Sequence, residues 1–152
     1  MVRILIVAAI FIAGWIPALV EAHTDIALLR DVICSYETRG EANPDRARGT
    51  SDELGRCQIR PGTARWVGYR GSDRYLSHAR INRHWSLKYL EFCKSKLGTD
   101  SVSRLAHAYV GGPYLPYEGY GKARRYAAQI LKRYRAAQFQ AVAARVFPWS
   151  RT

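Results

Sequence analysis

Residues 33–64 read ICSYETRGEANPDRARGTSDELGRCQIRPGTA, and this stretch decides how the chain is organised. An apolar helical pattern ends in an acid, Glu37, and a polar loop rich in Gly, Asn, Pro, Asp and Ser follows. The chain restarts as a helix after Pro61, because the fixed φ of proline suits the first helical position. A carboxyl group at a helix end, with apolar residues around it and a long loop over it, is where a general acid is expected. Glu37 is therefore the first candidate for a catalytic residue.

The length and the charge set the bounds for the rest of the chain. A chain of 152 residues, 48% of them hydrophobic, predicts one domain with a core. The 24 Lys and Arg residues outnumber the 12 Asp and Glu residues, which gives a net charge of +12. Such a charge predicts a polyanionic partner, namely nucleic acid, an anionic membrane or an acidic polymer.

The first 22 residues favour one cellular location. Arg3 is followed by an apolar run from 4 to 20 and by Val20-Glu21-Ala22, an acceptable signal-peptidase site. An uncleaved membrane anchor is the alternative, although the run is short for a membrane span and Pro17 favours cleavage. We expect residues 1–22 to be a signal peptide and residues 23–152 to be the exported domain, periplasmic or secreted. Export argues against nucleic acid as the partner.

The hydrophobic periodicity predicts a mainly α fold. Apolar residues recur at helical spacing, Thr24 or Asp25 can cap the first helix, and we find no alternating strand pattern. Residues 41–53 are expected to form a loop, 54–60 a turn or a brief extended piece, and 69–80 an irregular segment. The predicted helices run from about 26 to Gly40, 62–67, 81–97, 100–110 and 121–137, and the tail beyond 137 either extends the last helix or frays.

The chain has three cysteines, Cys34, Cys57 and Cys93, so an intramolecular disulfide leaves one thiol free. An exported protein can hold a disulfide, and a Cys34–Cys57 bond would tie the helix that carries Glu37 to the far side of the loop. Three buried thiols are the alternative. The four histidines are scattered and no metal-binding spacing is present, so the sequence predicts neither a metal nor a cofactor.

Three sequence blocks follow one another in a fixed order. They are Glu37 at a helix end, Gly55-x-x-Gln58-Ile59 with Pro61-x-Thr63-Ala64, and Ala108-Tyr109-x-Gly111-Gly112-Pro113 before a Tyr-rich final helix. Together these blocks resemble the lysozyme-like lytic transglycosylases of the soluble-transglycosylase type. The resemblance covers about residues 24–136, and the short length and the stretch 49–55 look most like the specialised members that accompany secretion, pilus or conjugation machines.

The resemblance implies a lysozyme-like helical domain and a role for several residues. Glu37 would be the single catalytic acid in cleavage of peptidoglycan glycan strands between N-acetylmuramic acid and N-acetylglucosamine. Gln58 would bind the substrate near its acetamido group, Tyr109 would hydrogen-bond Glu37 or the sugar, and Thr50 or Ser51 would add a hydroxyl. Components of a secretion, pilus or conjugation machine would be the protein partners. The apolar wall around the acid would come from Ile33, Tyr36 and Ile59.

The chain departs from the family pattern at three places. Thr38 follows the acid where Ser is usual, Arg56-Cys57 replaces a Leu-Met pair, and Val110 replaces an Asn, which removes an amide beside the site.

Two other functions compete with the transglycosylase. A hydrolase of the same fold would need a second carboxylate or a held water, and Asp45, Asp52 and Glu53 could supply one from the loop. A basic, non-catalytic peptidoglycan-binding or membrane-active protein would account for the charge alone.

Overall fold

The computed structural model describes residues 23–118 and 121–146, and these residues are mainly helical. The predicted signal peptide, residues 1–22, lies outside the described residues. No helix in the described ranges has the length and apolar character needed to span a membrane. The elements are α1 (Ile26–Glu37), η1 (Pro44–Arg46), α2 (Pro61–Trp66), η2 (Asp73–Ser77), α3 (Ala79–Leu97), α4 (Val102–Gly111) and α5 (Gly121–Val146).

Local capping signals account for where the helices begin and end. Asp25 caps α1 by accepting a hydrogen bond from the Leu28 N–H at 3.0 Å, and Ser101 caps α4 in the same way. Pro61 is the first residue of α2. Gly98 ends α3 with a φ of +56°, a left-handed conformation that glycine adopts without a steric penalty. Apart from the end of the last helix, the predicted helix boundaries agree with the structure within a few residues.

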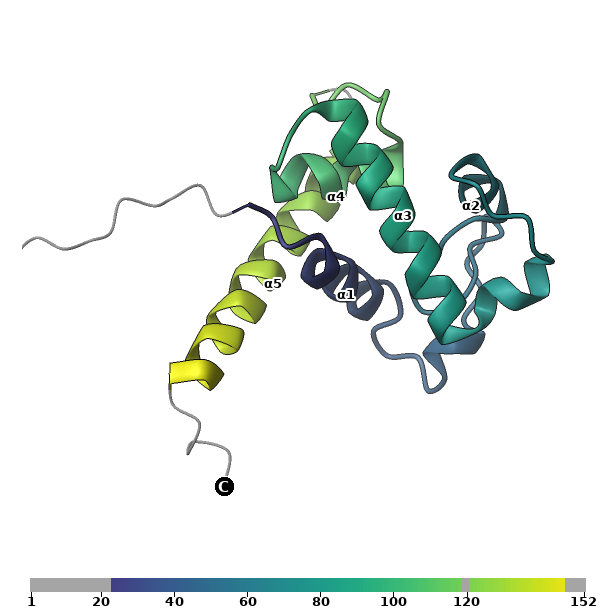
Figure 1. Ribbon diagram of the computed structural model, residues 1–152, viewed down its shortest axis with the longest axis horizontal. Coiled ribbons are helices and arrows are strands. Elements are labelled where there is room, and N and C mark those ends of the chain that lie inside the picture. Colours follow the sequence, from purple (N-terminus) through teal and green to yellow (C-terminus); the bar gives the residue numbers. More distant parts are fainter. Residues whose placement is uncertain (1–22, 119–120, 147–152) are drawn as a thin grey trace, which may run out of the picture.

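Four helices enclose the core. α1 packs against both α3 and α5, and α4 packs along α5 (Figure 1). Five large aliphatic side chains from these four helices are fully excluded from solvent, and their burial stabilises the fold. They are Leu29, Ile33, Leu90, Leu105 and Ile130.

The segment between α1 and α3 forms a separate, loop-rich side of the molecule. Residues 38–60 and the short α2 and η2 lie beside the first half of α3 (Figure 1). Leu54 forms isolated antiparallel bridges with Arg48 and with Ile59, and residues 55–58 form a turn between the bridged residues, so of the two alternatives expected for 54–60 the structure shows the turn. The irregular segment 69–80 contains η2, a single 3₁₀ turn stabilised by hydrogen bonds such as that from His78 N–H to Tyr75 carbonyl at 3.0 Å.

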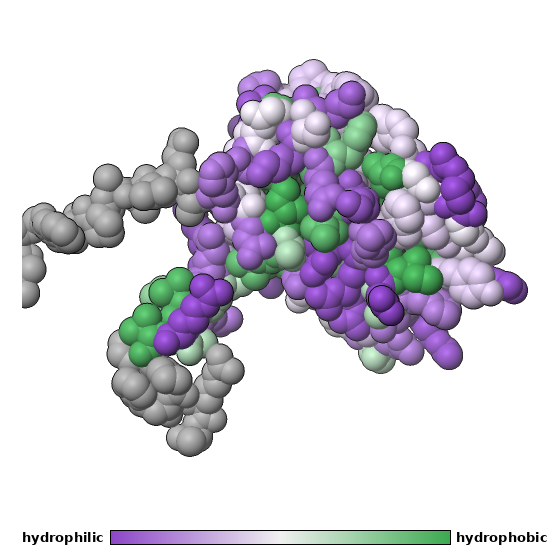
Figure 2. Space-filling model, in the orientation of Figure 1, coloured by the Kyte–Doolittle hydropathy of each residue, from purple (hydrophilic) through white to green (hydrophobic). Residues whose placement is uncertain are grey.

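The last helix is longer than the range 121–137, because α5 continues to Val146. Residues 136–146 are rich in Ala and Gln and contain no Gly or Pro, so nothing in the sequence ends the helix there. This end of α5 projects from the body of the molecule (Figure 1), and it carries apolar surface (Figure 2) where Phe139, Val142 and Val146 are exposed.

Candidate active site

Glu37 is the last residue of α1 and lies at the junction of the helical core and the loop-rich side. It lines a cavity of about 500 Å³. One wall comes from the loop and α2, and the other comes from the end of α4. The lining residues are Glu37, Gly49, Thr50, Glu53, Gln58, Ile59, Arg60, Thr63, Trp66, Tyr89, Tyr109, Val110, Gly111 and Gly112.

The environment of Glu37 favours its protonated form. Burial is the largest influence and raises the pKa of the Glu37 carboxyl above its ordinary 4.5. The Tyr126 hydroxyl and the charge on Arg39 lower the pKa, and the nearby Glu53 carboxylate raises it. The net shift is upward, so Glu37 keeps a proton to a higher pH than a solvated glutamate does. A group of this kind can donate that proton to a bound substrate.

Tyr126, on α5, is the neighbour of Glu37 that the sequence did not reveal. Its hydroxyl is buried, meets no partner at normal hydrogen-bond geometry among the described residues, and perturbs the titration of Glu37. Its ring packs edge-on against Tyr36, with 5.4 Å between the ring centroids. Tyr126 therefore places a hydroxyl donor beside the acid from the opposite side of the core.

Of the three residues expected around the acid, Ile59 lines the cavity with Glu37. Ile33 instead belongs to the fully buried core of the helices. Tyr36 packs on Tyr126 and lies outside the residues that line the cavity.

Gln58 faces the cavity in a constrained conformation. Its φ is +50°, a left-handed value that is uncommon for a residue other than glycine. Its side-chain Nε2 donates to the Gly55 carbonyl at 2.8 Å, and its backbone N–H donates to the same carbonyl at 3.0 Å. The amide is thus held in place by its own turn, and one Nε2 hydrogen and the Oε1 lone pairs are still available for a ligand.

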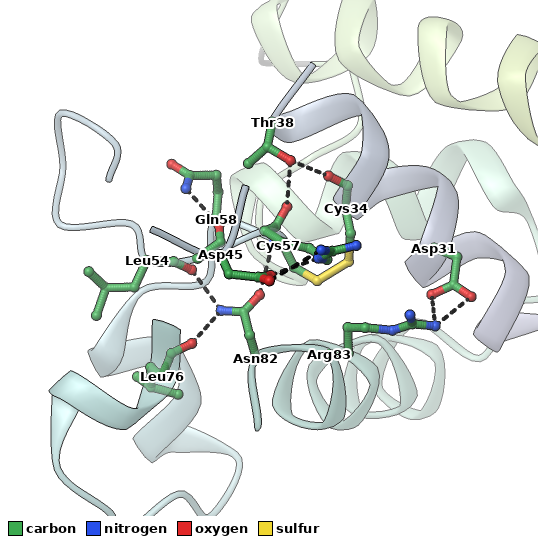
Figure 3. A network of polar contacts seen from close by, with 12 residues as sticks. Asp31, Cys34, Thr38, Asp45, Leu54, Cys57, Gln58, Leu76, Asn82 and Arg83 are labelled. Carbon is green, nitrogen blue, oxygen red and sulfur yellow. Dashed lines mark hydrogen bonds and ion pairs between the residues drawn. A yellow bond between two sulfur atoms is a disulfide. The ribbon is translucent and has the colours of Figure 1, made fainter. Parts of the chain in front are cut away.

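Asn82, on α3, supports this turn from below (Figure 3). Its side chain is fully buried, and its Nδ2 donates to the carbonyls of Leu54 and Leu76, both at 2.7 Å. Its Oδ1 accepts the Cys57 N–H at 2.7 Å. The Nδ2 also lies 2.7 Å from where a Cβ on Gly55 would stand, so only glycine fits that position. One side chain therefore joins two segments, the turn that carries Gln58 and the 3₁₀ helix η2.

A disulfide and a hydroxyl join the end of α1 to the same turn (Figure 3). The structure contains the Cys34–Cys57 bond, and Cys93 is a buried free thiol. The buried Thr38 hydroxyl lies 3.0 Å from the Cys34 carbonyl and 3.4 Å from the Arg56 carbonyl. The Thr38 hydroxyl thus lies within hydrogen-bonding distance of a backbone carbonyl in the last turn of α1 and holds the loop against that helix end.

The two departures at Arg56-Cys57 have a structural explanation. Cys57 forms the disulfide, and Arg56 pairs with Asp45 through hydrogen bonds of 2.8 and 3.3 Å. Both side chains therefore fix the loop. Val110, the third departure, lines the cavity with 44% of its surface exposed, so this part of the wall is apolar.

Tyr109 does not hydrogen-bond Glu37, which corrects one of the two roles expected for it. Its hydroxyl donates to the Cys57 carbonyl at 2.8 Å, a bond that links α4 to the turn. The ring is nearly buried but still lines the cavity. Contact with a sugar remains open to its hydroxyl lone pairs.

Thr50 and Ser51 are separated by the fold. Thr50 lines the cavity of Glu37, whereas Ser51 lines a neighbouring hollow and gives its backbone N–H to Glu53 at 2.8 Å. Of the two hydroxyls, only that of Thr50 belongs to the site. A Cβ on Gly49 would clash with the Glu53 carboxylate and stand 2.9 Å from the Glu53 Cβ, so any larger residue there would displace Glu53.

Glu53 is a second carboxylate in the cavity. It accepts hydrogen bonds from Arg60 at 2.8 and 3.0 Å. Burial is the largest influence on its pKa and raises it, but the hydrogen bonds from Arg60 and from backbone N–H groups together lower the pKa below its ordinary value. The two glutamates of the cavity therefore differ, with Glu37 biased towards the acid and Glu53 towards the carboxylate. Asp45 pairs with Arg56, and Asp52 lines the neighbouring hollow.

An aromatic platform forms part of the cavity wall. Trp66, at the end of α2, is 52% exposed although it is large and apolar. Its ring packs at a tilt against Phe92, with 4.9 Å between ring centroids, and against Tyr114, with 6.0 Å between centroids. Of these three rings, that of Trp66 lines the cavity, where its exposed indole presents an apolar surface that the sequence did not reveal.

No family model, curated protein or solved structure matches the chain. In the part of the chain that the structure describes, no group of three or more His, Cys, Asp or Glu side chains is arranged to hold a metal ion.

Proposed function

We propose that the protein is a peptidoglycan lytic transglycosylase with a lysozyme-like helical domain. The observation that carries the proposal is Glu37, a half-buried acid with a raised pKa in a cavity that also holds an exposed tryptophan. The amide of Gln58 and the hydroxyl of Thr50 line the same cavity. This combination supplies an acid, polar groups and an apolar platform, which a sugar polymer requires of its binding site.

Glu37 would act twice in one turnover. It would first protonate the oxygen between N-acetylmuramic acid and N-acetylglucosamine, and the bond from that oxygen to C1 would break. The substrate's own acetamido oxygen would stabilise the developing cation at C1, so a second protein carboxylate is not required for this step. The Glu37 carboxylate would then accept the proton of the C6 hydroxyl as that oxygen bonds to C1. The product is a 1,6-anhydro end, and no water is consumed.

Analysis of the products of peptidoglycan digestion tests the proposal. The wild-type protein is expected to release muropeptides with 1,6-anhydro ends, because the C6 oxygen replaces water as the nucleophile. Glu37→Gln is expected to lower the rate by at least about a hundredfold, the usual contribution of a general acid, without unfolding the protein. Full activity in this variant would identify a different acid.

A hydrolase of the same fold is the second candidate, and Glu53 favours it. This carboxylate shares the cavity with Glu37 and is held ionised by Arg60, as a base for a water molecule would be. A hydrolase would produce reducing ends and would lose its activity in Glu53→Gln. The transglycosylase would retain anhydro products in that variant.

A basic, non-catalytic binding protein is the third candidate, from a different class. Its motivation is the net charge of +12. Wild type and Glu37→Gln would then both bind insoluble peptidoglycan, with a strong salt dependence, and wild type would release no soluble fragments. Soluble anhydro fragments from wild type alone would exclude this candidate.

The biological setting follows from the same proposal. An exported enzyme of this size would open a local gap in the wall for a secretion, pilus or conjugation machine. Deletion of the gene is expected to reduce the output of the machine while bulk wall turnover is maintained. Reduced turnover with unchanged output would instead indicate a general housekeeping enzyme.

A further inference from the structure

We propose that an arginine-lined hollow beside the cavity binds the carboxylates of peptides that are attached to the glycan strand, an inference that rests on the proposed function. The hollow has a volume of about 710 Å³ and shares Arg60 and Thr63 with the cavity of Glu37. A polymer bound over Glu37 can therefore extend into the hollow without leaving the protein surface.

The positive charge of the hollow comes from four arginines in three separate parts of the chain. Arg48 belongs to the loop, Arg60 and Arg65 flank and end α2, and Arg74 belongs to η2. The surface over α2 and η2 is mostly hydrophilic (Figure 2). The fold thus gathers guanidinium groups that are distant in sequence around one hollow.

Two of the four arginines are already paired with a carboxylate. Arg60 pairs with Glu53 at 2.8 Å, and Arg65 pairs with Asp73. These pairs hold two of the guanidinium groups that line the hollow in place.

The other two arginines have no carboxylate partner within the described ranges. Arg48 and Arg74 are both exposed, and Arg74 lies over the Tyr75 ring, 4.7 Å from its centroid, while donating to the Tyr75 hydroxyl at 2.8 Å. Asp52 is the one lining carboxylate in the hollow that no arginine of the described residues pairs. The hollow therefore keeps a positive excess that an incoming anion can neutralise.

Carboxylate is the ligand that this chemistry selects. The planar guanidinium group presents N–H donors in a fork that fits a carboxylate through two hydrogen bonds. In the proposed substrate, each N-acetylmuramic acid carries a peptide whose free ends are carboxylates. Arg30, Arg80 and Arg83 also line a hollow, but it shares no residue with the cavity of Glu37. Of these two arginine-rich hollows in the described part of the chain, the one next to the cavity can engage a peptide while its sugar lies over the acid.

The test compares the binding of soluble, peptide-bearing glycan strands with that of the same strands after conversion of their carboxylates to amides. All proteins carry Glu37→Gln, so that the strands stay uncut. The test variant adds Arg48→Gln and Arg74→Gln. The control adds Arg124→Gln and Arg125→Gln on α5, which removes the same charge from a different surface.

The parent protein is expected to bind the strands with free carboxylates about tenfold more tightly than the amidated strands, the effect of about one charge-assisted hydrogen bond. The test variant should lose most of this preference and the control should keep it. Equal affinity of the parent for both strands, no binding to either strand, or a preference that survives in the test variant would overturn the inference. Failure of the proposed function would be seen separately, because wild type would then release no 1,6-anhydro ends from either kind of strand, whatever the binding ratio.

Discussion

Replacing Asn82 by Ala tests the structural basis of the site most severely. Asn82 does not line the cavity, yet it makes three hydrogen bonds of 2.7 Å, two to the turn that carries Gln58 and one to the Leu76 carbonyl in η2. The substitution leaves the Cys57 N–H and the carbonyls of Leu54 and Leu76 without their partner. All of these groups surround a side chain that is fully buried, so bulk water does not replace the lost bonds.

The expected loss follows from these three bonds. A net contribution of about 1 kcal/mol for each gives about 3 kcal/mol, and the cost of leaving buried polar groups unpaired adds to it. We therefore expect Asn82→Ala to lower the free energy of unfolding by about 3–5 kcal/mol, a large effect for a single substitution. The Gln58 turn should also lose its fixed position, so activity should fall under conditions where the variant is still folded.

Urea unfolding followed by tryptophan fluorescence, with the disulfide intact, measures the loss. Asn43→Ala is the matched control, because Asn43 caps no N–H with its side chain, and the control should stay within about 0.5 kcal/mol of wild type. Asn82→Asp should be less destabilising in acid than at neutral pH. A protonated Asp side chain can donate a hydrogen bond to one of the two carbonyls, whereas an ionised one is repelled by both. A loss below about 1 kcal/mol in Asn82→Ala would refute the supporting role.

Four further predictions concern the acid, the disulfide and the platform. Replacing both disulfide cysteines, Cys34 and its partner, by Ser should cost about 3 kcal/mol of unfolding free energy for a loop of this length, and an unchanged urea midpoint would contradict this. Glu53→Gln should lower the pKa of Glu37 and move the alkaline limb of the pH–activity profile to lower pH, whereas Arg39→Gln should move it to higher pH; shifts in the opposite directions would refute the proposed electrostatics. Glu37→Gln should raise the melting temperature at mildly alkaline pH, where the wild type buries a charge, and this gain should vanish below the ordinary pKa of 4.5. A gain that is largest in acid would mean that folding lowers the pKa of Glu37, which would contradict the prediction. Trp66→Ala should raise KM for glycan strands about tenfold while Trp66→Phe keeps most of the affinity, and equal KM values for both variants would argue against stacking.

The parts of the structure that the sequence predicted depend on local signals. The cap at Asp25, the first-position proline of α2 and the glycine after α3 each act on neighbouring backbone groups, so the sequence around them is sufficient. The Cys34–Cys57 bond was one of two open alternatives, because spacing alone gives no geometry. Glu37 and Gln58 were found through short motifs, and the structure places both in one cavity.

The parts that the sequence did not predict depend on contacts between distant segments. Asn82 lies in an ordinary polar position of a helical pattern, and only the fold brings loop carbonyls to it. Trp66 has the spacing of a core residue but ends a helix at the cavity, and Tyr126 reaches the acid from the last helix. The sequence does not predict where α5 ends for a different reason, since no capping residue or helix breaker marks an end before Val146.

Digestion of peptidoglycan in water enriched in heavy oxygen tests the central claim most directly. The C6 oxygen of the substrate closes on C1 in the proposed reaction, so wild-type products should carry anhydro ends, one water lighter than reducing ends, without heavy oxygen. Glu37→Gln should give neither product. Reducing ends that carry heavy oxygen at C1 would show that water is the nucleophile, and they would contradict the transglycosylase in favour of the hydrolase.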